Sequence, residues 1–228
     1  MTGDFLRRVA LVPARDEEAT IRHTIGALLR LPIDEVVVVD DGSSDATTSA
    51  ALAAGATVLR IPGHAGKGGA MEGALLRLPP ADVWLFADAD LGASAAGLDT
   101  LLDVVVSGRA DLAIALFPRQ DGAGLGTVKR SSAGAIRLLS GFRADEPLSG
   151  QRAITAACLD AVRPLAQGFG METAMTIDAV RAGFRVVEVP VPGLTHRATG
   201  RSFSGFVHRG RQGVQIARAA SARAVRLR

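Results

Sequence analysis

Residues 83–90 read Val-Trp-Leu-Phe-Ala-Asp-Ala-Asp, a short apolar run that ends in two aspartates one residue apart. A continuously apolar run of this length is typical of a strand with both sheet faces covered. In an extended segment, residues two apart point the same way, so Asp88 and Asp90 can face one point beyond the strand. Ligands of open α/β sheets bind beyond the carboxyl ends of the strands. The stretch therefore predicts a buried strand with a site at its end.

Short β-branched runs alternate with longer helical patterns on both sides of this stretch. We expect strands at 9–12, 35–40, 56–60, 83–87 and 112–116, and helices at 17–30, 44–54, 69–78 and 94–106. After Pro118 we expect strands at 151–154 and 185–189, and helices at 128–139, 155–162, 171–182 and from about Ser202. Such alternation predicts crossover connections. The fold class is therefore α/β, with a mostly parallel Rossmann-like sheet flanked by helices, in one domain over residues 1–228.

Charge is unevenly distributed along the chain. The formal net charge is +3, yet residues 189–228 contain eight arginines and no acidic residue, so the rest of the chain is net acidic. A basic tail suggests nucleic acid, but the acidic body argues against that partner, and we expect no nucleic acid. From Ser202 onward, a basic amphipathic helix would be able to lie on an anionic membrane. We favour the alternative that this helix packs on the domain or on a second subunit, which leaves a homodimer open.

Two further features bear on location and chemistry. No apolar run approaches the roughly 20 residues that a membrane-spanning helix needs, and residues 1–5 lack the cationic start of a secretory signal. We therefore expect a cytoplasmic protein, with peripheral contact at the inner face of the membrane left open. The single cysteine, Cys158, excludes an internal disulfide and a cysteine-built metal site.

Polar residues also follow the first two expected strands. The first leads into Pro13-Ala14-Arg15-Asp16-Glu17, and the second into Asp40-Asp41. Two carboxylates at one strand end repel each other unless they accept hydrogen bonds from a ligand or from the backbone, and ribose hydroxyls and a base N–H would serve. Asp45 is better explained as the N-cap or first-turn acid of the next helix. Acidic residues at three strand ends predict one shared crevice.

Asp88 and Asp90 offer hard oxygen ligands, which suit Mg²⁺ or Mn²⁺ with positions left for phosphate oxygens. The glycine-rich segment 63–69 precedes a helix, and its backbone N–H groups and Lys67 would be able to approach phosphates. It is not a P-loop, because Ile61 stands where a glycine belongs and Gly68 replaces the serine or threonine. The first strand does not lead into G-x-G-x-x-G, which argues against a dinucleotide oxidoreductase.

Together these residues resemble the family 2 glycosyltransferases of the GT-A fold, over most of the chain. The resemblance implies that residues 1–117 form a nucleotide-sugar-binding half, 118–201 an acceptor-side half and 202–228 a basic C-terminal helix. It also implies a metal motif at Asp88-Ala89-Asp90. The nucleotide-sugar site that we expect from it consists of Pro13, Ala14, Arg15, Glu17, Asp40, Asp41, Lys67, Asp88, Ala89 and Asp90.

Two later motifs are similar to those of dolichyl- or polyprenyl-phosphate hexose synthases. They are Ser149-Gly150-Gln151-Arg152, like S-G-x-R, and residues 197–202, like R-x-x-G-x-S. The chain departs from the family pattern at Phe203, where lysine is usual, and at Asp16, where asparagine is usual. The likeness implies a phosphate-bearing acceptor, and the residues that we expect to bind it are Gln151, Arg152, Arg197, Arg201 and Ser202.

Other motifs resemble the glucosyl- or mannosyl-3-phosphoglycerate synthases. Residues 147–150 (Pro-Leu-Ser-Gly), 169–172 (Phe-Gly-Met-Glu) and His196-Arg197 have counterparts there. This resemblance implies that His196 completes the metal shell with Asp88 and Asp90. Glu172, at the start of a helix, either complements the helix dipole or faces the donor or the acceptor.

The sequence therefore predicts metal-dependent transfer of a hexose from a UDP- or GDP-hexose, with Mg²⁺ or Mn²⁺, to a phosphate-bearing acceptor such as polyprenyl phosphate. The alternative acceptor is a small molecule such as 3-phosphoglycerate. A phosphate acceptor needs no strong base, whereas a hydroxyl acceptor does, and Asp145, Glu146 and Glu172 are candidates for it. A sugar nucleotidyltransferase and a non-catalytic nucleotide-sugar binder are the alternatives from other classes.

Overall fold

The computed structural model describes residues 6–62, 65–118, 126–167 and 170–195. These residues form a seven-stranded sheet in the order β3-β2-β1-β4-β6-β5-β7. Strand β6 runs antiparallel to both of its neighbours, β4 and β5, and the other strand pairs are parallel. The strands are β1 (Arg8–Ala14), β2 (Glu35–Asp40), β3 (Thr57–Arg60), β4 (Val83–Phe86), β5 (Leu112–Leu116), β6 (Arg152–Thr155) and β7 (Val186–Pro190). The predicted α/β class and mostly parallel sheet are confirmed.

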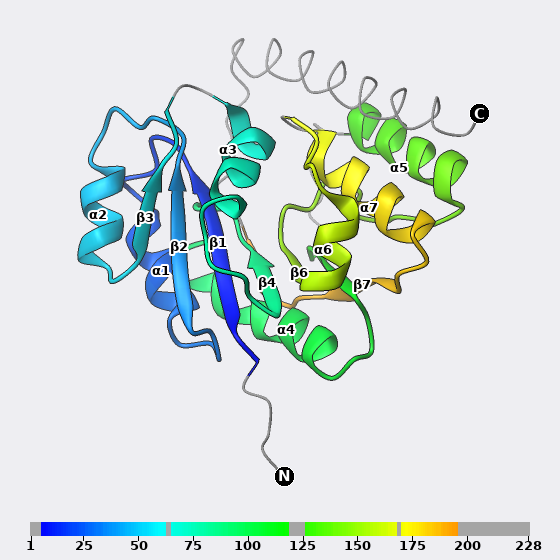
Figure 1. Cartoon of the computed structure of the whole chain (residues 1–228), viewed down its shortest axis with the longest axis horizontal. Helices are drawn as coiled ribbons and strands as arrows, with labels where there is room; N and C mark the ends of the chain where they lie inside the picture. The colour runs from blue at the N-terminus through cyan, green and yellow to red at the C-terminus, as the bar shows by residue number, and fades with distance from the viewer. Residues whose placement is uncertain (1–5, 63–64, 119–125, 168–169, 196–228) are drawn as a thin grey trace.

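Helices cover both faces of this sheet (Figure 1). Helices α1, α2 and α4, with the 3₁₀ helix η1, pack on one face, whereas α3, α6 and α7 pack on the other. Helix α5 packs against α7. The helical elements are α1 (Ile21–Leu28), α2 (Thr47–Ala53), α3 (Gly66–Leu75), η1 (Gly92–Leu98), α4 (Asp99–Val106), α5 (Gly126–Ser140), α6 (Ala156–Val162) and α7 (Met171–Arg181).

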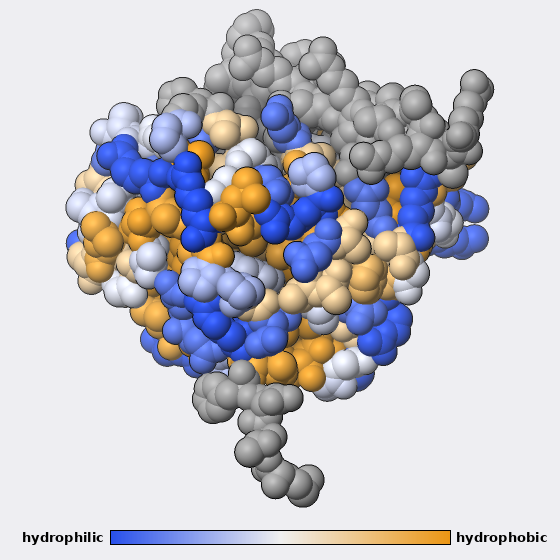
Figure 2. Space-filling model, viewed as in Figure 1, coloured by the Kyte–Doolittle hydropathy of each residue, from blue (hydrophilic) through white to orange (hydrophobic). Residues whose placement is uncertain are grey.

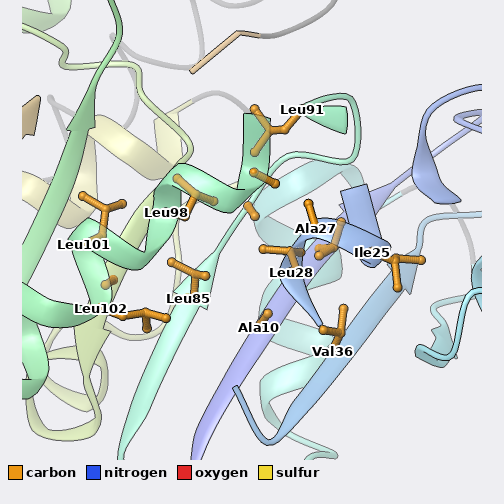
Figure 3. Close-up of a cluster of buried hydrophobic side chains, with 14 of the residues drawn as sticks. Ala10, Ile25, Ala27, Leu28, Val36, Leu85, Leu91, Leu98, Leu101 and Leu102 are labelled. Carbon is orange, nitrogen blue, oxygen red and sulfur yellow. The ribbon is translucent and has the colours of Figure 1, made fainter. Parts of the chain in front are cut away.

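The alternation of side chains along the strands divides the core into two layers. In β1, Ala10 and Val12 face the layer with α1 and α4, whereas Val9 and Leu11 face the layer with α3. The close-up in Figure 3 shows the first layer, in which α1 and α4 side chains meet the central strands. Each fully buried leucine or isoleucine stabilises the fold by about 1.5–3 kcal/mol. This packing fixes the strand ends from which the polar loops emerge.

The first helix is shorter than the sequence predicts. We expected it over 17–30, but α1 begins at Ile21. The backbone N–H of Glu17 donates to Thr47 Oγ1 at the start of α2, and that of Glu18 donates to Asp45 Oδ2 on the loop after β2. These contacts, between segments about 30 residues apart, keep residues 17–20 in a turn that helical periodicity does not reveal.

Helix α3 begins at Gly66 rather than at the expected residue 69. The carboxylate of Asp41 accepts hydrogen bonds from the N–H groups of Ala65 and Gly66, which supplies the acceptors that a helix N-terminus lacks. The strand expected at 151–154 is found as β6, and the long helix expected at 94–106 begins as η1 and continues as α4. The helix expected from about Ser202 lies outside the described residues.

Within the residues described, no helix is long and apolar enough to cross a membrane. On the face seen in Figure 2, apolar patches are interrupted by hydrophilic residues. The basic segment for which we considered membrane contact, residues 202–228, is not among the described residues.

Candidate active site

The loops after β1 and β2 are joined by reciprocal hydrogen bonds. Asp16 donates its N–H to Ser43 Oγ at 3.1 Å, and its Oδ1 accepts from the N–H of Ser44 at 2.8 Å. Glu18 Oε2 accepts from the N–H of Ala46 at 2.9 Å. Asp16 has a φ of 55°, in the left-handed region that aspartate and asparagine tolerate best among residues with a Cβ. The backbone that carries the predicted nucleotide-binding residues is therefore fixed.

The predicted residues of the first loop follow the end of β1. Pro13 and Ala14 lie in the strand itself, where Ala14 pairs with Asp40 of β2. Arg15 is exposed. Glu17 is half-buried, and its Oε2 accepts from Thr20 Oγ1 at 3.0 Å. These residues are thus brought next to the end of β2, as the prediction of a shared crevice requires.

Asp40 is completely buried at the end of β2. Burial raises the pKa of this carboxyl, but hydrogen bonds from Ser43 and Thr48 and the charge of Arg60, whose Nε lies 3.2 Å away, lower it further than burial raises it. The net pKa lies below the usual value, so Asp40 is ionised at neutral pH. Its carboxylate accepts from the backbone N–H of Ser43 at 2.7 Å and so holds the loop after β2, which is the backbone alternative of the sequence analysis.

Asp41 has a structural role as well. Its two carboxylate oxygens accept from the N–H groups of Ala65 at 2.9 Å and Gly66 at 3.0 Å. A negative charge at this point also complements the N-terminal dipole of α3. Asp45 accepts from the N–H of Thr47, the first residue of α2, at 2.9 Å. The N-cap of α2 is Ala46 and its first turn contains no acid, so Asp45 lies one residue before the N-cap that we predicted it to be. Nucleotide binding by Asp40 and Asp41 stays a prediction.

A charged cluster lies beyond the end of β4. Lys67 Nζ is 2.7 Å from Asp88 Oδ1 and 2.9 Å from Glu172 Oε1. Gln151 Nε2 donates to the other oxygen of Asp88, Oδ2, at 2.7 Å. Burial would lower the pKa of Lys67, but the two carboxylates raise it well above its usual value. Lys67 is therefore a permanent cation at the carboxyl end of β4.

The atoms around position 150 explain why a glycine stands between Ser149 and Gln151. A Cβ at this position would lie 2.4 Å from Lys67 Nζ and 2.8 Å from both carboxylate oxygens of Asp88. Real Cβ contacts do not come this close, so any side chain would displace the ion pair. The Ser-Gly-Gln-Arg motif thus includes a backbone position that packs directly against the charged cluster.

Arg152 is completely buried in β6. Its Nε donates to the Ser149 carbonyl at 2.8 Å and its Nη1 to Thr176 Oγ1 at 2.9 Å. Burial lowers its pKa to about 10, although Glu172, Glu188 and Asp88 act in the opposite direction, so the group is charged at neutral pH. Among the described residues, Arg152 Nη2, Gln151 Oε1 and Ser149 Oγ have no hydrogen-bond partner.

The three candidate bases lie in different surroundings. Glu146 forms an ion pair with Lys129 at 2.7 Å. Asp145 is exposed, and its backbone N–H donates to Glu188 Oε2 at 2.8 Å. Burial raises the pKa of Glu188. Glu172, at the start of α7, is 3% exposed and forms the ion pair with Lys67. Glu172 therefore does more than complement the helix dipole, whereas Asp145 lies at the surface, and a catalytic role for any of the three stays a prediction.

Thr24, which the sequence did not single out, contacts the turn at residues 89–92 that contains Asp90. Thr24 Oγ1 donates to the Ala89 carbonyl at 2.8 Å and accepts from the N–H of Gly92 at 2.8 Å. The only signal in the sequence was a polar residue between Ile21, Ile25 and Leu28 on the buried side of a helix. Such a threonine in an apolar stripe is a place to look for a tertiary hydrogen bond, because buried hydroxyls need partners.

The fit of this site to Mg²⁺ or Mn²⁺ depends on Asp90. The described residues contain no group of three or more His, Cys, Asp or Glu side chains arranged for a metal ion. Both oxygens of Asp88 already accept hydrogen bonds, from Lys67 and Gln151. Mg²⁺ is commonly bound through one or two carboxylates together with substrate phosphates and water. Asp90, which is half-buried and two residues from Asp88, fits such an ion, and its role as a metal ligand stays a prediction.

The remaining predicted residues, His196, Arg197, Arg201 and Ser202, lie outside the described part of the chain. The last described residue, Thr195, donates its N–H to Ser94 Oγ at 3.1 Å. Ser94 lies four residues after Asp90 in the chain. A small pocket lined by Leu75, Trp84, Leu159 and Arg163, among others, lies at the amino end of β4, so it is separate from this site.

The chain belongs to the glycosyl transferase family 2, because the model of that family matches residues 9–160. It is 30% identical over 204 residues to the glycosyltransferase AglD of Haloferax volcanii, an alignment that covers 79% of this chain and 32% of that protein. It is also 30% identical over 193 residues to the glucosyl-3-phosphoglycerate synthase of Mycolicibacterium paratuberculosis, covering 74% and 58%. The chain thus spans about a third and somewhat over half of these two relatives.

The fold of similar proteins with solved structures supports the family assignment. The glucosyl-3-phosphoglycerate synthase of Mycobacterium tuberculosis, in complex with Mg²⁺ and uridine diphosphate, superposes with a TM-score of 0.81 at 26% identity. The match covers 96% of this chain and 79% of that one. The same enzyme with Mn²⁺, UDP-glucose and phosphoglyceric acid gives a TM-score of 0.79 at 25% identity, covering 96% and 80%. The family and the GT-A fold that the sequence predicts are both confirmed.

Proposed function

We propose that this chain transfers glucose from UDP-glucose to a small phosphorylated acceptor, with Mg²⁺ or Mn²⁺. The observation that carries the proposal is the charged cluster of Lys67, Asp88 and Glu172 beside Asp90, at the carboxyl end of β4. The structurally similar synthase binds UDP-glucose, a divalent ion and phosphoglyceric acid. The fold of this chain is similar to that of this synthase, which supports the proposal.

The donor would lie across the carboxyl ends of β1, β2 and β4. The loops at 13–17 and 40–41 are joined to each other and to the start of α3, so they form one rigid wall for a base and ribose. The diphosphate would extend from this wall toward Asp90. Lys67 Nζ, a permanent cation, lies next to Asp88 at the end of β4, so it is on the side of the predicted diphosphate.

The chemical difficulty is the departure of a nucleoside diphosphate, because negative charge accumulates on the leaving phosphates. A divalent ion bound there supplies Lewis-acid stabilisation of that charge. Asp90 would orient it, and Lys67 would add a fixed positive charge. The hydrogen bonds from Lys67 and Gln151 to Asp88 keep the turn in place without requiring reorganisation during the reaction.

On the acceptor side, the comparisons favour a small phosphorylated molecule, the alternative of the sequence analysis, over polyprenyl phosphate. The similar synthase has been solved with phosphoglyceric acid and with glycerol 3-phosphate.

The test is a transfer assay with UDP-glucose and Mn²⁺, in which 3-phosphoglycerate, glycerol 3-phosphate and a polyprenyl phosphate in detergent are compared as acceptors. We expect a glucosylated product with a phosphorylated three-carbon acceptor, and its loss in Asp90→Asn and with EDTA. Asp103→Asn, which changes an exposed acid on α4, is the matched control and should behave as wild type. A product with polyprenyl phosphate alone would overturn the choice of acceptor. No product with any acceptor would overturn the proposed function.

A further inference from the structure

Thr24 joins α1 to the turn formed by residues 89–92, which contains Asp90. The residue is 0% exposed, and its side chain comes from α1, 65 positions before Ala89. Its hydroxyl donates to the Ala89 carbonyl and accepts from the N–H of Gly92, each at 2.8 Å. Asp90 and Leu91 lie between these two backbone groups in the chain. The hydroxyl therefore closes a four-residue turn that contains Asp90.

The geometry determines which way the single hydroxyl proton points. Besides Ala89, the only other carbonyl with a hydrogen bond from this hydroxyl among the described residues is that of Thr20, at the longer distance of 3.4 Å. The 2.8 Å contact is the stronger bond, so the proton goes to Ala89 and the lone pair accepts from Gly92. A serine or threonine hydroxyl can do both at once, whereas an aliphatic side chain can do neither.

Different elements hold Asp88 and the turn that contains Asp90. Asp88 is held through its side chain, by Lys67 and Gln151. The Ala89–Gly92 turn, which contains Asp90, is held through its backbone, by the hydroxyl of Thr24. Leu91 of the same turn belongs to the apolar cluster to which α1 contributes Ile25 and Leu28 (Figure 3). Helix α1 therefore supports this turn by a polar contact and an apolar one.

We propose that Thr24 is a positioning residue for Asp90: its hydroxyl sets the direction of the carboxylate on which divalent-ion binding with UDP depends. The inference rests on the proposed function, because it assumes that Asp90 binds the ion. Thr24 itself is completely buried, so it would act through the backbone of the turn rather than by contact with a ligand. Removing a group that orients a metal ligand without binding the metal itself lowers metal affinity by about 10- to 100-fold.

The test compares Thr24→Val, which keeps the shape and removes the hydroxyl, with Thr24→Ser, which keeps the hydroxyl. Thr100→Val is the matched control, because the Thr100 hydroxyl also donates to a nearby carbonyl, that of Gly97, outside the turn. Binding of Mn²⁺ at saturating UDP is measured by the paramagnetic resonance signal of free Mn²⁺, and binding of UDP in EDTA by calorimetry. The melting temperature of each variant is recorded.

We expect Thr24→Val to weaken Mn²⁺ binding about tenfold or more, with UDP binding in EDTA unchanged. Thr24→Ser and Thr100→Val should stay within about twofold of wild type. A general loss of structure would weaken metal-free UDP binding as well, so the two measurements separate positioning from folding. Should Thr24→Val not fold, Thr24→Ala gives the same comparison with Thr24→Ser.

Two results would overturn the inference while leaving the proposed function in place. In the first, wild type binds Mn²⁺ with UDP and Thr24→Val binds it equally well. In the second, Thr24→Ser loses as much affinity as Thr24→Val, so the hydroxyl is not the operative group. If wild type itself shows no Mn²⁺-dependent UDP binding, the proposed function fails, and the inference fails with it.

Discussion

The Nζ of Lys67 lies 2.7 Å from Oδ1 of Asp88, and this ion pair joins the first turn of α3 to the residues after β4. Glu172 of α7 completes the cluster from the other side of the site. Three elements that are distant in sequence are thus tied together at one charged point.

Replacing Lys67 should therefore affect the fold as well as the site. Lys67→Met leaves Glu172, which is 3% exposed, without its cation. Breaking a buried ion pair costs about 3–5 kcal/mol, and because Asp88 is partly exposed we expect the lower end of that range in urea unfolding. Lys67→Met combined with Glu172→Gln should regain part of the loss, since the buried carboxylate that lost its lysine is then neutral. A single variant as stable as wild type would show that the cluster does not contribute to stability.

Gly150→Ala should disrupt the same cluster from the backbone side. The added Cβ would approach Lys67 Nζ to 2.4 Å, and overpacking of this kind costs about 1–3 kcal/mol. The control is Gly134→Ala in α5, where an added Cβ meets nothing within 4 Å. In an exposed helix that change should stabilise by about 0.5–1 kcal/mol. Thermal unfolding measures both variants, and equal shifts in the two would contradict the assignment of Gly150 to a close contact.

Substitutions at Asp16 test whether the loop after β1 depends on this side chain, at a position where asparagine is usual in the family. Because asparagine also tolerates the left-handed region and can accept from Ser44, Asp16→Asn should change stability by less than about 0.5 kcal/mol. Asp16→Ala loses that acceptor and adds backbone strain at a φ of 55°, so it should cost about 1–2 kcal/mol. If alanine is tolerated as well as asparagine in chemical denaturation, the loop does not depend on this side chain.

Asp40 gives the site region a pH dependence with a definite sign. Its folded pKa lies below the usual value, so the ionised carboxylate stabilises the native state above the unfolded pKa of about 3.9. This contribution is lost as the pH falls through the lower folded pKa. Asp40→Asn should therefore be less stable than wild type at pH 7, and the difference should shrink below about pH 4. Urea unfolding at several pH values checks this, with Asp103→Asn as control; a difference that is constant with pH would contradict it.

The sequence was sufficient for the features that depend on local pattern. The apolar run at 83–86 identified β4, and the polar residues after β1 and β2 marked the loops that follow these strands. These predictions succeed because parallel strands buried on both faces are continuously apolar. The family resemblance then followed from motifs at those strand ends, and the family match over residues 9–160 confirms it.

The sequence was not sufficient for features that depend on contacts between distant segments. It did not show that β6 runs antiparallel between β4 and β5, because strand order and direction are set by the whole sheet. Nor did it show that Arg152, expected to bind an acceptor, is buried against Thr176 on α7. The hydroxyl of Thr24 was missed for the same reason, since its partners lie 65 and 68 residues away.

The most direct test of the central claim is calorimetric titration of UDP-glucose into the protein with Mn²⁺ and with EDTA. Wild type, Asp90→Asn and the control Asp103→Asn are compared. We predict binding that Mn²⁺ strengthens at least about tenfold in wild type and in Asp103→Asn, and that Mn²⁺ no longer strengthens in Asp90→Asn. Equal binding of UDP-glucose by all three proteins with and without Mn²⁺ would contradict a metal-dependent donor site at the end of β4.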